Sequence, residues 1–167
     1  MRIETSTIED IETIVGLYED ADAYQKIITK QALKEFDPKL LEPEIRQERH
    51  WKIIIDEQIA CVFTISFEDS TFWGTRAMDQ AIYIHRIATN PLFRGNSFVK
   101  YIVTWSRLYA RQNGRRYIRV HTAAGNLKLA GYFISCGFNY MGRVKFESEE
   151  LPVQRKQLYW ALFEIII

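Results

Sequence analysis

Cysteine is scarce in this sequence, with only Cys61 and Cys136 among 167 residues. Their separation matches no zinc-ligand spacing, and two cysteines are too few for a disulfide framework. These counts argue against a zinc module and against a disulfide-rich secreted scaffold. We therefore expect a reducing compartment and predict a cytoplasmic protein that needs no metal.

An excess of charge is also missing, because 22 Lys and Arg residues face 21 Asp and Glu residues for a net charge of +1. Nothing in this balance requires a polyanionic partner or a membrane surface. The opening segment "MRIETSTIED" has no apolar stretch typical of a signal peptide, and no run approaches the ~18 apolar residues of a membrane span. We predict neither nucleic acid nor membrane as a partner.

Repeats, low-complexity segments and linkers are absent, and 47% of the residues are hydrophobic. This length and composition suit one core, so we predict a single domain over residues 1–167. Alternation and helical spacing predict the element order β-α-α-β-β-β-α-β-α-β-β. The expected fold class is α/β (α+β), with a mixed central β-sheet flanked by helices.

Particular segments support this order. Ser6 and Glu9 have capping-box spacing before an amphipathic helix, and Asp37-Pro38 should separate two short helices within 29–50. Residues 50–69 read as a hairpin that turns at 56–58, and 70–79 read as a loop. The expected strands and helices that follow are a central strand over 81–89, a helix from Phe98 that stops at Asn113-Gly114, a strand over 116–122, a short helix closed by Gly137 and a final strand within 155–167.

The stretch "RIATNPLFRGNSFVKYIV", residues 86–103, passes from the predicted central strand through a turn into a helix. Such a turn aims backbone amides and the positive end of the helix dipole at one point, which attracts phosphate. Arg94 adds a cation, and Gly95 removes a side chain that would keep an anion away from the backbone. A plain polar connector is the alternative interpretation. The glycine patterns of nucleoside-triphosphate and dinucleotide loops are absent.

Together with "YIHRIATNP", "YIRVHT" and "GNLKLAGYFISCGF", this turn closely resembles the GNAT superfamily of acetyl-CoA-dependent N-acetyltransferases. The resemblance implies direct transfer of an acetyl group from acetyl-CoA to the amine of an unidentified small molecule, peptide or protein. It implies that Ile87, Ala88 and Thr89 offer backbone groups and that Asn126 bonds the cofactor arm. The turn that would hold the diphosphate comprises Arg94, Gly95, Asn96, Ser97, Phe98 and Val99.

Two departures from the family pattern affect this reading. Ser97 and Val99 occupy the family's two glycine positions, which puts cofactor affinity in question. Phe133 stands where the family has the tyrosine thought to protonate the departing thiolate, so that general acid is absent. The neighbouring Tyr132 points about 100° away around the predicted helix.

A base must accept a proton from the acceptor amine. His85, in the central strand, is our candidate, because imidazole titrates near working pH. His121 at the end of the neighbouring strand, and Glu68 and Asp69 near the expected acceptor cleft, are alternatives. Each histidine could equally be a hydrogen-bonded structural residue.

Four aromatic residues lie in segments that the family uses for its acceptor pocket, where a cation could stack. Filling of the core is the competing interpretation for them. They are Tyr24, Phe36, Phe72 and Trp73.

Two other functions stay open at this point. One is an acyl-CoA-binding module of the same fold that has lost turnover, which the phenylalanine at position 133 favours. The other is nucleic-acid binding through "RRYIR" and "RLYAR", although these basic residues lie among predicted core positions. The apolar end "ALFEIII" would permit a homodimer.

Overall fold

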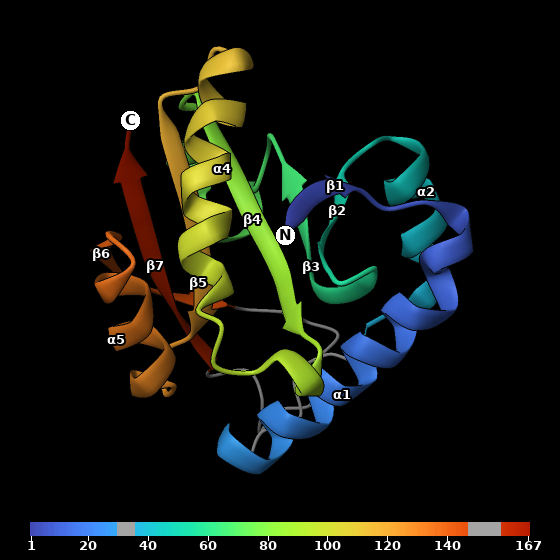
Figure 1. Ribbon diagram of the computed structural model, residues 1–167. Helices are drawn as coiled ribbons and strands as arrows, with labels where there is room; N and C mark the ends of the chain where they lie inside the picture. The colour runs from blue at the N-terminus through green and yellow to red at the C-terminus, as the bar shows by residue number, and fades with distance from the viewer. Residues whose placement is uncertain (30–35, 147–157) are drawn as a thin grey trace. The chain divides into compact units, whose positions relative to one another are not determined.

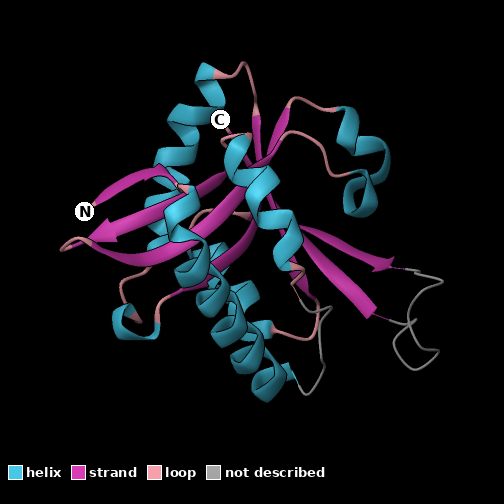
Figure 2. Cartoon of the chain, turned by 90° about the vertical axis from the view of Figure 1, so that its right-hand side faces the viewer, coloured by secondary structure: helices cyan, strands magenta, loops and turns pink. Residues whose placement is uncertain are grey.

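The computed structural model describes residues 1–29, 36–146 and 158–167 (Figure 1). The chain forms two compact units, which we call unit 1 and unit 2. Unit 1 comprises Met1–Ile65 and Ile84–Phe98, and unit 2 comprises Ser66–Tyr83 and Val99–Ile167. Figure 2 shows the helices and strands of the chain.

Unit 1 begins with an antiparallel arrangement of three strands. They are β1 (Arg2–Thr5), β2 (His50–Ile55) and β3 (Gln58–Ser66). Strand β1 pairs with β2, and β2 pairs with β3. The β2–β3 connection is the predicted hairpin. Asp56 and Glu57 both have left-handed φ values, +47° and +60°, as a two-residue turn that follows the strand twist requires.

Two helices belong to this unit. A 3₁₀ turn, Ile8–Asp10, leads into α1 (Ile11–Thr29), and a second one, Pro38–Leu40, leads into α2 (Leu41–Arg46). The Asp37 carboxylate accepts from the Lys39 amide at 3.0 Å and so begins the second turn. The predicted break at Asp37-Pro38 is therefore confirmed on its C-terminal side, while most of the helix expected before it lies outside the described residues.

The predicted capping box is wrong by one residue. Thr7 precedes the first turn, and its amide donates to Asp10 Oδ2 at 2.7 Å. Ser6 still belongs to the strand ladder, because its amide donates to the His50 carbonyl at 2.9 Å. Pairing of β1 with β2 thus delays the entry into the helix by one position.

The core of unit 1 combines apolar residues with a buried series of three hydrogen-bonded polar side chains. The buried apolar side chains come from α1, α2, β3 and β4: Ile14, Leu17, Tyr18, Leu41, Ile45, Val62 and Ala88. Ser6 Oγ lies 2.7 Å from His50 Nδ1, and Tyr18 Oη lies 2.9 Å from His50 Nε2. Both ring nitrogens of a fully buried histidine are thereby satisfied, as burial of a polar ring requires.

Strand β4 (Ala81–Thr89) and helix α4 (Phe98–Gln112) each contain residues of both units. In unit 2, β4 pairs in parallel with β5 (Tyr117–Ala123) from Ala81↔Tyr117 to Tyr83↔Arg119. The predicted β-α-β unit and its parallel strands are confirmed. Gly114, with φ +65°, follows the last turn of α4, where a left-handed residue ends a helix.

The rest of unit 2 consists of α5 and two strands. They are α5 (Leu127–Ser135), β6 (Asn139–Phe146) and β7 (Leu158–Ile166). Strand β7 is antiparallel to both β5 and β6. The strand order β1-β2-β3-β4-β5-β7-β6 is mixed, and β4 is the middle strand. The predicted fold class is confirmed.

The prediction of a loop over 70–79 is wrong. Residues Ser70–Trp73 form the short helix α3, and Gly74–Met78 continue as a 3₁₀ turn. The Asp69 carboxylate begins α3 by accepting from the Phe72 amide at 3.3 Å. Trp73 is buried against Ala81, Tyr83 and Leu162, and this burial, which local sequence does not reveal, fixes the segment.

Arg119 is the buried cation of unit 2, with 1% of its side chain exposed. Its Nε donates to Glu164 at 2.8 Å, and its terminal nitrogens donate to Asp79 and to the Tyr83 hydroxyl at 2.5 and 3.0 Å. The guanidinium also lies 4.5 Å from the ring of Trp73. One arginine of "RRYIR" is thus engaged inside the unit, which weakens the nucleic-acid reading.

Within the described part of the chain, no helix has the length and apolarity to cross a membrane.

Burial of His50 makes a prediction about acid stability. Burial, and next the Arg86 charge, lower the pKa of His50 to about 3 in the folded protein, against ~6.5 for an unperturbed imidazole. Between pH 6.5 and 3 the unfolded chain binds the extra proton. The free energy of unfolding should therefore fall by up to about 1.4 kcal/mol per pH unit as pH drops through this window. Above pH 6.5 the stabilising contribution of neutral His50 should be complete.

The test is urea unfolding of the wild type and of His50→Gln at several pH values from 7.5 to 4.5. Glutamine can hydrogen-bond but does not titrate, so the variant should lose less stability on acidification. Equal pH slopes in the two proteins would contradict the assignment.

Candidate functional site

The turn after β4 is anchored to β3 by Asn90. The Asn90 amide donates to the Ala60 carbonyl at 2.9 Å, and its side-chain nitrogen donates to the Ile59 carbonyl at 2.9 Å. Its side-chain oxygen accepts from the Leu92 amide at 3.0 Å, which starts the 3₁₀ turn Pro91–Phe93. One side chain therefore fixes both where β4 ends and how the turn begins.

The next four residues, 94–97, are exposed and lead directly into α4. Gly95 has φ +91° and Ser97 has φ +53°, both in the left-handed region. The Asn96 side chain donates to the Phe93 carbonyl at 2.8 Å and holds the turn together. The first amides of α4 have no intrahelical acceptor, so this end of the helix suits an anion.

The predicted cofactor residues of this turn differ in what they can offer. Arg94 is exposed, and its guanidinium lies 4.7 Å from the centre of the Tyr24 ring on α1. This stacking orients the cation without neutralising it. Phe98 and Val99 point into the core, with 3% and 6% exposed. Only their backbone groups can therefore serve a ligand.

The second half of β4 contains a backbone irregularity at Arg86, whose φ is +49°. A non-glycine residue in this region costs roughly 1–2 kcal/mol, so the surrounding contacts must hold it there. The Arg86 guanidinium pairs with Glu44 of α2 and lies 5.9 and 5.2 Å from the rings of Tyr18 and Phe36. The irregularity directly precedes three predicted cofactor contacts, Ile87, Ala88 and Thr89.

His85, Ala88 and Thr89 have contacts with β3. Thr89 Oγ1 lies 3.8 Å from Cys61 Sγ, and Ala88 is buried. The His85 carbonyl accepts from Thr64 Oγ1 at 3.4 Å, and the His85 side chain is half-buried. His85 is thus fixed in position at the start of this segment.

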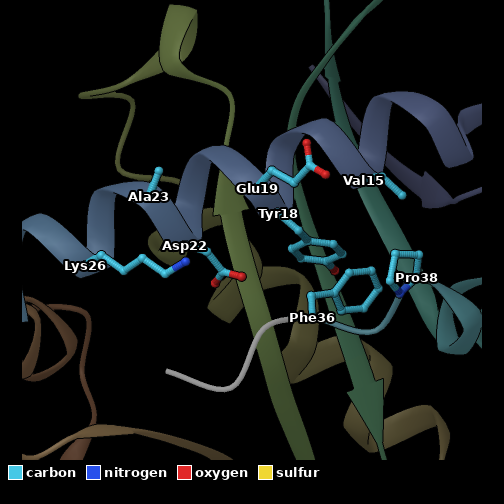
Figure 3. A pocket seen from close by; sticks show the side chains of 8 residues that line it. All are labelled: Val15, Tyr18, Glu19, Asp22, Ala23, Lys26, Phe36 and Pro38. Carbon is cyan, nitrogen blue, oxygen red and sulfur yellow. The ribbon is translucent and has the colours of Figure 1, made fainter. Parts of the chain in front are cut away.

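A pocket of about 330 Å³ lies along α1 in unit 1 (Figure 3). We call it the α1 pocket. Its lining residues are Val15, Tyr18, Glu19, Asp22, Ala23, Lys26, Phe36 and Pro38. The rings of Tyr18 and Phe36 lie side by side with centroids 4.5 Å apart, and two carboxylates and one ammonium group come from α1. Burial raises the pKa of Tyr18, so its hydroxyl stays protonated.

The four predicted pocket aromatics therefore have different surroundings. Phe36 lines the α1 pocket, and Tyr24 supports Arg94. Trp73 fills the core of unit 2. Phe72 stacks on His121, with ring centroids 3.8 Å apart. The sequence pattern missed Tyr18 and Arg86, because only the fold brings α1 and α2 to the irregular residue of β4.

Asn126 and Phe133 belong to α5 in unit 2. Asn126 is 7% exposed, and its side-chain oxygen accepts from the Leu129 amide at 3.0 Å as the helix N-cap. Its side-chain nitrogen is the group that can donate to a ligand. Phe133 is 5% exposed, and its ring lies 5.7 and 5.4 Å from those of Phe138 and Phe163. At this position the fold has a packed ring in place of a proton donor.

Asp69 and His121, two of the alternative bases, lie together in unit 2. The Asp69 Oδ2 atom is 3.3 Å from His121 Nδ1. Spacing along the chain could not reveal this pair, because 51 positions separate the two residues and α4 lies between them.

The chain is similar in sequence or in fold to known N-acetyltransferases. No protein-family model matches the chain. The chain is 24% identical over 160 residues to the "Uncharacterized N-acetyltransferase YesJ" of Bacillus subtilis, an alignment that covers 84% of this chain and 89% of that protein.

Two solved structures are similar over nearly the whole chain. One is an acetyltransferase of the GNAT family from Listeria monocytogenes, with a TM-score of 0.80, 19% identity and coverage of 99% and 94% of the two chains. The other is a ribosomal-protein-alanine N-acetyltransferase from Brucella melitensis, with a TM-score of 0.71, 15% identity and full coverage of both chains.

The predicted resemblance is confirmed at the level of the fold: the chain has the fold of GNAT acetyltransferases.

The left-handed backbone at Ser97 makes a prediction about stability. Ser97→Gly should raise the free energy of unfolding by about 1 kcal/mol, because glycine adopts this backbone region without the cost that a Cβ imposes. Urea unfolding at neutral pH measures the change. Ser97→Ala is the matched control, because it removes the hydroxyl but keeps the Cβ, and it should give no gain. Equal effects of the two substitutions would disprove the explanation.

Proposed function

We propose that this chain is an acetyl-CoA-dependent N-acetyltransferase whose residues 1–167 act as one catalytic domain. It moves an acetyl group to the amine of a small molecule, peptide or protein by direct attack. The observation that carries the proposal is the anchored, exposed turn over 94–97, which follows an irregular strand and opens α4. The agreement of fold with GNAT proteins over nearly the whole chain supports it.

In this proposal the diphosphate of acetyl-CoA is held by backbone amides between Arg94 and Val99. Gly95 leaves room for the anion, and the oriented Arg94 cation balances part of its charge. The cofactor arm pairs with backbone groups of Ile87, Ala88 and Thr89 as an added strand would. The Asn126 side-chain nitrogen donates to the same arm, because its oxygen is engaged in the helix cap.

The amine nitrogen attacks the thioester carbonyl carbon, the C–N bond forms, and the C–S bond breaks as the thiolate leaves. The proton that the nitrogen loses passes to a base, for which His85 of β4 is the candidate. A backbone amide of β4 stabilises the developing oxyanion. Holding both reactants in line can supply ~7–11 kcal/mol of the barrier reduction. With Phe133 packed in the core, water protonates the thiolate, and the reaction lacks the roughly 10²–10⁴-fold help of a side-chain acid.

The α1 pocket is the proposed place for the acceptor. Its aromatic pair favours a flat or cationic group, and the Glu19 and Asp22 carboxylates favour a positive one. The Arg86 guanidinium, 5.9 and 5.2 Å from the two ring centroids, does not oppose a cation strongly because Glu44 neutralises it. Both small amines and peptide amino groups meet these requirements.

We also propose a cytoplasmic location. Neither Cys61 nor Cys136 forms a disulfide bond, which suits a reducing compartment.

A homodimer would have to use a sheet edge that does not involve β7, because β7 lies between β5 and β6. Its apolar residues Ala161, Leu162, Phe163 and Ile165 are buried within the chain itself.

The function is tested by incubating the protein with acetyl-CoA and a panel of primary amines while free thiol is measured. Thiol release that requires both protein and amine is the expected result. Mass spectrometry of the product should show acetylation of the amine. Binding of acetyl-CoA without thiol release across a broad panel would support the acyl-CoA-binding module instead.

Arg94→Glu should weaken binding of coenzyme A by at least about tenfold, because it places a negative charge beside the diphosphate. The free energy of unfolding should change by no more than about 1 kcal/mol, since the residue is exposed and contributes one ring contact. Titration calorimetry and urea unfolding measure the two effects. Arg111→Glu, an equal charge change in the last turn of α4, is the control. Unchanged affinity in Arg94→Glu would show that the phosphates bind elsewhere.

A further inference from the structure

Tyr24 brings an aromatic ring of α1 to the turn that follows β4 (Figure 1). The centre of its ring lies 4.7 Å from the Arg94 guanidinium carbon, and 46% of the residue is exposed. Both residues belong to unit 1. Their contact therefore joins α1 to the turn over 94–97 within a single unit.

Helical spacing explains why the ring reaches this turn. One face of α1 has a residue at every third or fourth position: Ile14, Leu17, Ala21 and Tyr24. The first two are buried in the core of unit 1, and Ala21 packs against that core. Tyr24 is the next residue on the same face, and its ring covers the guanidinium of Arg94. Burial of the first part of α1 thus fixes where this ring lies.

The Arg94 side chain is held by the ring but keeps its full charge. In the part of the chain that the structure describes, no carboxylate pairs with it. Arg86 provides the contrast, because its guanidinium also lies near aromatic rings but is paired with Glu44. A ring attracts a guanidinium through its quadrupole without cancelling the positive charge. Arg94 is therefore oriented and still available to an anion.

Stacking also leaves the useful edge of the guanidinium open. The ring covers a face of the planar group, whereas the N–H donors that bind phosphate oxygens in pairs lie in its plane. A side chain that is already oriented has less conformational freedom to lose when a ligand binds. Removal of the ring should therefore weaken anion binding even though the arginine is still present.

We propose that Tyr24 is the positioning residue of Arg94 in the proposed acetyltransferase, on which this inference rests. It raises the affinity for the diphosphate of acetyl-CoA by orienting the arginine and does not touch the reacting atoms. The aromatic ring makes the contact, so the hydroxyl is not needed. The effect is smaller than that of the cation itself, because the ring acts only through the arginine.

Titration calorimetry of the full-length protein with coenzyme A tests this role. Tyr24→Leu removes the ring and should weaken binding by about two- to fivefold, the factor expected for an exposed cation–π contact. Tyr24→Phe keeps the ring and should bind like the wild type. Equal losses in the two variants, or no loss in Tyr24→Leu, would overturn the inference.

Tyr159→Leu is the matched control. Tyr159 is 41% exposed, and its ring centre lies 4.8 Å from the Arg143 guanidinium carbon in unit 2. The variant therefore removes the same kind of contact at a place with no proposed role in binding. Its affinity for coenzyme A should be unchanged. A loss like that of Tyr24→Leu would show that such substitutions act through the fold in general, against a specific role for Tyr24.

A double-mutant cycle separates positioning from a purely structural role. In Arg94→Ala the cation is gone, so adding Tyr24→Leu should weaken binding no further. Two losses that multiply would contradict the inference. The cycle is repeated with coenzyme A that lacks its 3′-phosphate but keeps the diphosphate, and the same coupling is expected. Coupling that disappears with this analogue would place Arg94 on the 3′-phosphate and overturn the assignment to the diphosphate.

Kinetics give a second readout. With any amine that is turned over, Tyr24→Leu should raise the KM for acetyl-CoA by about two- to fivefold and leave kcat within about twofold. A lower kcat at unchanged KM would count against positioning. Failure of the wild type to bind coenzyme A would refute the proposed function itself, whereas binding with independent effects of the two substitutions would refute only the role of Tyr24.

Discussion

Hydrogen bonds of Asn90 are the constraint on which the proposed cofactor site depends. They tie the end of β4 to the Ile59 and Ala60 carbonyls and start the turn that follows. With its beginning fixed in this way, the segment over 94–97 can stay exposed and can adopt left-handed backbone at two residues. An anchored turn presents its amides in one arrangement, so little order has to be gained when an anion binds.

A second strained position, Arg86, shows how unit 1 compensates for an unfavourable backbone. Its ion pair with Glu44 and its contact with two aromatic rings hold the side chain on one side of β4. One of these rings belongs to Tyr18, whose hydroxyl is hydrogen-bonded to His50, and His50 is hydrogen-bonded to Ser6. The buried polar groups thus form one connected chain, so the irregular strand and the wall of the α1 pocket depend on the same contacts.

Much of the fold could be predicted because its signals are local. Periodicity gave most strands and helices, Asn113-Gly114 gave the end of α4, and the spacing from Asn126 to Gly137 contributed to the resemblance that predicted the fold. Two local predictions were wrong for a shared reason. Ser6 is held in the β1–β2 ladder, and the segment after Asp69 is folded by burial of Trp73. Both outcomes depend on contacts with distant strands, which no short window of sequence contains.

What the sequence alone determined is the order of the strands, the place of the turn between β4 and α4 and the phenylalanine at the family's tyrosine position, since each depends on residue type at a fixed spacing. Only the tertiary structure decided which side chains meet. It paired Asp69 with His121, stacked Arg94 on Tyr24 and buried Arg119 among acidic partners. The physical reason is that a side chain's charge and hydrogen-bonding role are set by neighbours in space, and strand pairing brings those neighbours from positions far apart in the chain.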